Sequence, residues 1–87
     1  MARDDTAEPC RIVLQNELSL VLRKIEVSAR EIVKQCEIIA MLEKTGHDTT
    51  EALATLANFE RVYELKIASH RKIMRELATL GQVSRLR

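Results

Sequence analysis

The feature that most constrains this chain is its one interruption, the segment EKTGHDTTEAL from Glu43 to Leu53. Helix-favouring residues dominate both sides of it, and the 87 residues contain only two glycines and one proline. Gly46 stands where a helix often ends in a left-handed residue, and Asp48, followed three residues later by Glu51, resembles the start of a capping box. A stop signal and a start signal this close together predict a tight antiparallel hairpin.

Composition points to an all-α protein. One Phe, one Tyr and no Trp, together with few turn-forming residues, argue against a β-sandwich or barrel. We expect a flexible tail over residues 1–8 and a first helix over about 9–45, with Pro9 in its first turn. A turn at 46–48, a second helix over about 49–80 that ends before Gly81, and a flexible tail over 82–87 complete the expected order.

Apolar residues recur at alternating intervals of four and three in both halves, which is the pattern of a coiled-coil-like helix pair. Folding the chain at its tip pairs these seams at a constant register, with the polar Gln35 opposite Glu60. The seam of the first half is Leu14, Leu18, Val21, Ile25, Ser28, Ile32, Gln35, Ile39 and Leu42. That of the second half is Leu53, Leu56, Glu60, Tyr63, Ile67, His70, Met74 and Leu77. The register pairs Leu42 with Leu53, Ile39 with Leu56, Ile32 with Tyr63, Val21 with Met74, and Leu18 with Leu77.

A second apolar stripe runs beside the first and predicts a further interface, with a second copy or a partner. Its members are Leu22, Ala29, Cys36, Phe59, Ile73 and Leu80. Two helices alone leave such a surface in water, so we expect a homodimer that forms a four-helix bundle. The pattern leaves open which stripe packs within the hairpin and which packs between chains.

The candidate chemical sites are sparse. His47 and Asp48 at the tip could form a catalytic or metal-binding pair, although capping already accounts for Asp48. Gln35 and Glu60 could join a carboxylate to an orienting amide, although a polar layer that sets the register explains them as well. The chain has no glycine-rich phosphate loop and no CxxC spacing. We therefore expect no enzyme activity, no cofactor and no metal.

Charge allows one alternative function. The net charge is +1, yet six Lys or Arg residues and one acidic residue lie between Lys66 and Arg87. Arg71, Lys72 and Arg75 would share a helix face and could contact nucleic-acid phosphates, although a solvated face explains them too. No apolar segment reaches the roughly 20 residues that span a membrane, and the N-terminus lacks an apolar signal core. We expect a small cytoplasmic interaction or regulatory protein with an unidentified protein partner.

The segment from Ile32 to Leu77 resembles small helical-hairpin proteins of alphaproteobacteria such as rhizobia. The GHDT tip is the most distinctive shared element, and a histidine that often follows the Phe-Glu pair is replaced here near Leu65 and Lys66. The resemblance implies a helical hairpin and no activity. It rests on Gln35, Ile38 to Ala40, Leu42-Glu43, Gly46 to Thr49, Leu56, Phe59-Glu60, Arg71 and Glu76-Leu77.

Overall fold

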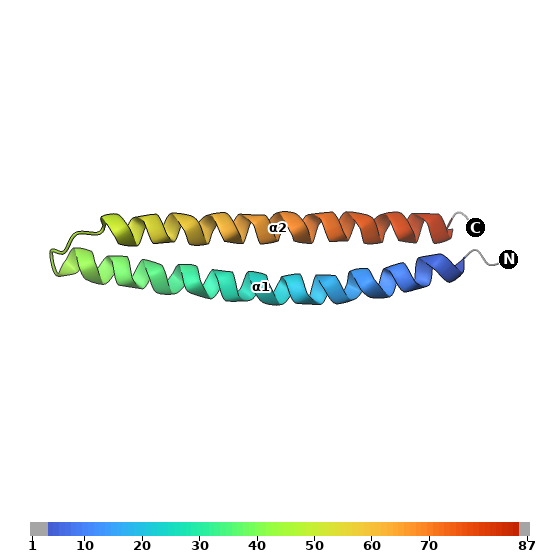
Figure 1. Cartoon of the computed structure of the whole chain (residues 1–87), viewed down its shortest axis with the longest axis horizontal. Coiled ribbons are helices and arrows are strands. Elements are labelled where there is room, and N and C mark those ends of the chain that lie inside the picture. The colour runs from blue at the N-terminus through green and yellow to red at the C-terminus, as the bar shows by residue number, and fades with distance from the viewer. Residues whose placement is uncertain (1–3, 86–87) are drawn as a thin grey trace.

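The computed structural model describes the backbone of residues 4–85 and the side chains of residues 8–82. This part of the chain is two antiparallel α-helices, α1 (Asp4–Lys44) and α2 (Thr50–Arg85), joined by residues 45–49 (Figure 1). Helices of 41 and 36 residues are roughly 60 and 54 Å long at about 1.5 Å per residue. The predicted all-α hairpin is confirmed.

The helices extend further than the sequence suggested. α1 begins at Asp4 and carries Pro9 inside it, and α2 continues through Gly81 to Arg85. Glu8 favours helix near the start of α1, because acidic side chains interact well with the N-terminal end of the helix dipole. Gly46 has the one positive φ angle among the described residues, so Gly81 does not end α2. The remainder of the expected tails, residues 1–3 and 86–87, lies outside the described residues.

The predicted seam of α1 is confirmed. All nine of its positions are buried or half-buried, and Ser28, Gln35 and Ile39 are only 6%, 9% and 8% exposed. Spacings of four and three keep these side chains on one side of α1 along its whole length. This side faces α2.

The predicted seam of α2 is partly wrong, because the helix is rotated about its axis. Leu53 and Met74 are 49% and 46% exposed, and Glu60 is exposed too. The expected partners of Leu42, Val21 and Gln35 therefore lie outside the buried seam. The side chains of α2 that are buried or half-buried on the side facing α1 follow a different series: Ala52, Leu56, Phe59, Tyr63, Lys66, His70, Ile73, Leu77 and Leu80.

The core of the hairpin is thin. Ile39 and Ile73 are the only apolar side chains less than 9% exposed among the described residues, and none of these residues is completely buried. Two helices in contact cover only one side of each other, so the remaining sides stay in solvent. The large apolar side chains that stay at least 41% exposed are Ile12, Val13, Leu20, Leu22, Val27, Val33, Ile38, Met41, Leu53, Val62, Leu65 and Met74.

Candidate interaction surface

The tip is built as the sequence predicts on its α1 side. Gly46 has a φ of 76°, and its N–H donates to the Glu43 carbonyl at 3.2 Å. The N–H of His47 donates to the Leu42 carbonyl at 2.8 Å. These two bonds form a Schellman motif, which satisfies carbonyls that the end of α1 would otherwise leave unpaired. The tip therefore sets where α1 ends.

Asp48 supports the start of α2 through hydrogen bonds to Thr50, and not through the capping box expected with Glu51. Its Oδ1 accepts hydrogen bonds from the Thr50 N–H at 3.0 Å and the Thr50 hydroxyl at 2.8 Å. These bonds, led by that of the Thr50 hydroxyl, lower the pKa of the Asp48 carboxyl from 3.8. The Leu53 N–H donates to the Thr49 carbonyl at 2.8 Å, so Thr49 occupies the N-cap position and Asp48 precedes it.

His47 and Asp48 do not form a pair. The Nδ1 atom of His47 lies 2.7 Å from the Thr45 hydroxyl oxygen, which in turn lies 2.9 Å from the Met41 carbonyl oxygen. Both contacts are satisfied when His47 donates to Thr45 and Thr45 donates to Met41. Over the part of the chain that the structure describes, no three His, Cys, Asp or Glu side chains are grouped to hold a metal ion. The contacts of both tip side chains are those of a helix connection.

Among the described residues, one hydrogen bond joins α1 to α2, and Gln35 donates it. Its Nε2 donates to the Ala52 carbonyl in the first turn of α2 at 2.9 Å. Gln35 is 9% exposed, so its amide needs a partner inside the hairpin. The predicted polar contact with Glu60 is replaced by this bond, which lies eight residues nearer the start of α2.

The six residues predicted to form a dimer or partner interface separate into two groups. Phe59, Ile73 and Leu80 face α1, and Ile73 is only 7% exposed, so these three pack within the hairpin. Leu22 and Cys36 are exposed, and the half-buried Ala29 lines a groove with Leu22 that contains no α2 residue, so these three lie on the outer surface of α1. The rotation of α2 thus moves half of the predicted interface into the core.

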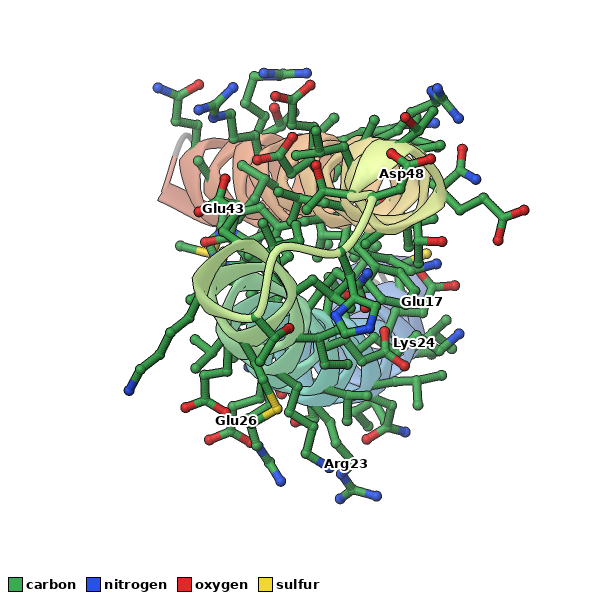
Figure 2. All side chains as sticks on the ribbon, turned by 90° about the vertical axis from the view of Figure 1, so that its left-hand side faces the viewer. Glu17, Arg23, Lys24, Glu26, Glu43 and Asp48 are labelled. Carbon is green, nitrogen blue, oxygen red and sulfur yellow. The ribbon has the colours of Figure 1, made fainter. Side chains whose placement is uncertain are left out.

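The exposed apolar side chains collect on two opposite flanks of the hairpin. Seen from the tip, Glu17 and Lys24 project to one side of α1, while Glu26 and Glu43 project to the other and Arg23 points away from α2 (Figure 2). We name the Glu17 side the Leu20 flank, because Leu20 and Glu17 line one groove together with Ser69 and Lys72 of α2. The opposite side is the Leu22 flank, because Leu22 and Glu26 line another groove.

Helical spacing assigns the other residues to these flanks. Seven large apolar side chains lie on the Leu20 flank: Val13, Leu20, Val27, Ile38 and Met41 from α1, and Val62 and Leu65 from α2. Five lie on the Leu22 flank, namely Ile12, Leu22, Val33, Leu53 and Met74. The sequence carries a signal for the first set, since Val13, Leu20, Val27 and Met41 follow a seven-residue repeat interrupted only at Lys34.

The three basic residues considered for nucleic-acid contact are all exposed. Arg71, Lys72 and Arg75 lie on α2, and none of them forms an ion pair with another described residue. Between described side chains, ion pairs join Arg11 to Glu8 and Arg30 to Glu26, and both lie on α1. The basic side chains therefore remain available to an external anion.

Comparison with family models, with curated proteins and with solved structures finds no match for this chain. In the described residues, neither helix contains a stretch long and apolar enough to cross a membrane.

Proposed function

We propose that this protein is a non-enzymatic interaction module that acts as a homodimer and offers a helix face to a protein partner. The observation that carries the proposal is the mismatch between its thin core and its exposed apolar surface. A compact monomer of 9.9 kDa has an accessible surface of about 5,200 Å². This chain has 6670 Å². The excess of about 1,500 Å² lies in the range that each subunit of an obligate homodimer buries.

Two flanks suit two kinds of contact. A twofold dimer buries the same surface on both chains, so one flank of each hairpin is enclosed and the other stays available. In a four-helix bundle of two hairpins, the flank at the dimer contact would be enclosed between the two pairs of helices. The exposed flank would then serve the protein partner. Cys10 and Cys36 are free, exposed thiols, a state that suits the reducing cytoplasm that we propose as the protein's location.

The first test is the mass in solution, measured by light scattering over a dilution series at low and high salt. We expect twice the chain mass of 9.9 kDa, with little change on adding salt because the contact is mainly apolar. A monomer at micromolar concentration would contradict the homodimer. The partner contact is tested by capture with the wild-type protein and with variants that place one charge on each flank. Binding lost by a variant that is still dimeric identifies the flank in use.

The unpaired basic residues of α2 favour one alternative, a bundle that binds nucleic acid. Three phosphate contacts by Arg71, Lys72 and Arg75 would make the logarithm of the affinity fall with the logarithm of salt at a slope of roughly −2.7 for duplex DNA. Replacing all three by alanine should flatten this slope while the mass in solution stays the same. An absence of binding at low salt removes the alternative.

A further inference from the structure

We propose that a second copy of this chain docks on the Leu20 flank in antiparallel orientation, so that the tip of each hairpin covers the open end of the other. This inference rests on the proposed homodimer and names its face and its direction. Three observations carry it: the grooves on this flank, the symmetric placement of two of its apolar residues, and the sign of its charges.

Three grooves lie on the Leu20 flank, and the groove lined by Leu22 lies on the opposite flank. At the open end, Pro9, Cys10, Val13 and Leu14 of α1 form an apolar groove with Leu80 of α2. It continues toward the middle into the groove lined by Leu20, since Leu14 and Glu76 line both. Near the tip, Ile38 and Met41 line a further depression on the same flank. Apolar concave surface therefore runs along this flank at both ends of α1.

Two apolar residues of this flank are placed symmetrically about Val27, whereas Leu20 falls opposite the partner's Lys34. Val13 and Met41 each lie fourteen residues from Val27, or roughly 21 Å along α1. A twofold axis through Val27 therefore brings Met41 of one chain to Val13 of the other, at the open-end groove. Met41 is 67% exposed, the highest value among the large apolar side chains of the described residues, and this arrangement covers it.

The same axis suits α2. The hydrogen bond between Gln35 and Ala52 puts these two residues at about the same level along the hairpin. Ten residues further toward the open end, Ile25 of α1 is then level with Val62 of α2. Val62 and Leu65 are the two large apolar side chains that α2 presents on this flank. They therefore lie near the level of Val27, where a twofold axis would pack them against their own copies in the partner. α1 then lies on the partner's α1, and α2 on its α2.

The charged residues favour the Leu20 flank over the Leu22 flank as a surface for docking a second copy. On the Leu20 flank of α1, the charged residues are Glu17, Lys24, Glu31 and Lys34. About the axis at Val27, Glu17 falls within one turn of the partner's Lys34, and Lys24 within one turn of the partner's Glu31. Over both helices, the described part of the Leu22 flank carries Glu26, Glu43, Glu60 and Glu64 with a single base, Arg71, whereas α2 adds one base and one acid, Lys72 and Glu76, to the Leu20 flank. Doubling the Leu22 flank would oppose acid with acid.

Thiol cross-linking tests the face and the direction together. In a Cys36→Ser background Cys10 is the only thiol, and it lines the open-end groove. Adding Met41→Cys places a second thiol where the partner's Cys10 is expected, whereas the two thiols of one chain are roughly 46 Å apart on one helix. With a short bismaleimide, we expect this variant to migrate as two covalently joined chains on a denaturing gel.

Two matched controls give the reverse expectation. Val33→Cys in the same background adds a thiol of similar exposure, 57%, on the Leu22 flank and should stay a single chain on the gel. The Cys36→Ser protein alone should also stay a single chain, since the two copies of Cys10 lie at opposite ends of the antiparallel dimer.

The outcomes separate this inference from the proposed function. Linkage through Val33→Cys instead of Met41→Cys, or linkage of Cys10 to its own copy, in a protein that light scattering shows to be dimeric would overturn the face or the direction and leave the homodimer standing. A monomeric mass for all variants and for the wild type would overturn both.

Discussion

The rotation of α2 can be tested with two adjacent residues, Ile73 and Met74. Ile73→Ala removes three carbon atoms from a side chain that is 7% exposed. At about 0.8 kcal/mol per buried carbon, the transfer cost is about 2 kcal/mol. A cavity adds to it, so we expect a loss of about 2–3 kcal/mol, at the lower end of the usual range because the core is thin. Met74→Ala acts on a side chain that is 46% exposed, and we expect a loss of about 1 kcal/mol or less.

Urea unfolding followed by far-UV circular dichroism measures both losses. All variants must be compared at one protein concentration, because the stability of the proposed dimer would depend on it. With a denaturant slope of roughly 1–3 kcal/mol per molar, Ile73→Ala should lower the midpoint by about 0.7–3 M. If that protein does not fold, Ile73→Val, with an expected loss of about 1 kcal/mol, replaces it. An equal or larger loss for Met74→Ala would refute the rotation and restore the seam expected from periodicity.

Three further predictions concern the tip and the register. Gly46→Ala should destabilise the protein by roughly 1–2 kcal/mol because of the positive φ, whereas Gly81→Ala should stabilise it by roughly 0.5–1 kcal/mol; equal signs in thermal unfolding would contradict this. Gln35→Ala should cost about 1 kcal/mol in urea unfolding, since the bond to the Ala52 carbonyl is lost, and an unchanged midpoint would show that this bond does not hold the register. The lowered pKa of Asp48 predicts a stabilisation that is complete above its ordinary value of 3.8 and is lost as pH falls through the lower folded value. Asp48→Asn should therefore reduce stability near neutral pH and flatten its decline in acid, and parallel pH profiles for the two proteins would rule this out.

Much of this architecture could be predicted from local signals. The seam of α1 follows from one pattern of alternating spacings, in which apolar or small residues stand at every position except Gln35. The tip follows from Gly46, which accepts a left-handed backbone at low cost, and from Asp48, which can hold the first turn of α2. These are properties of neighbouring residues, so no knowledge of the tertiary structure is needed.

The orientation of α2 was decided only by the tertiary structure. Apolar residues stand side by side along it, as in Ala52-Leu53 and Ile73-Met74, so two rotations about its axis satisfy the periodicity equally well. The choice between these two rotations depends on how the connection at 45–49 orients the first turn of α2. It depends also on the hydrogen bond from Gln35 to the Ala52 carbonyl. The same rotation turns the half-buried Phe59 toward α1 and leaves Glu60 in solvent.

The two apolar flanks follow from that rotation. Sequence periodicity describes the spacing of residues along one helix, so it can show that each helix is apolar over more than one stripe. Which stripes of α1 and α2 join into one continuous surface depends on the relative rotation and level of both helices, and these are set by packing across the hairpin. The sequence therefore predicted apolar surface beyond one seam, and the tertiary structure decided where that surface lies.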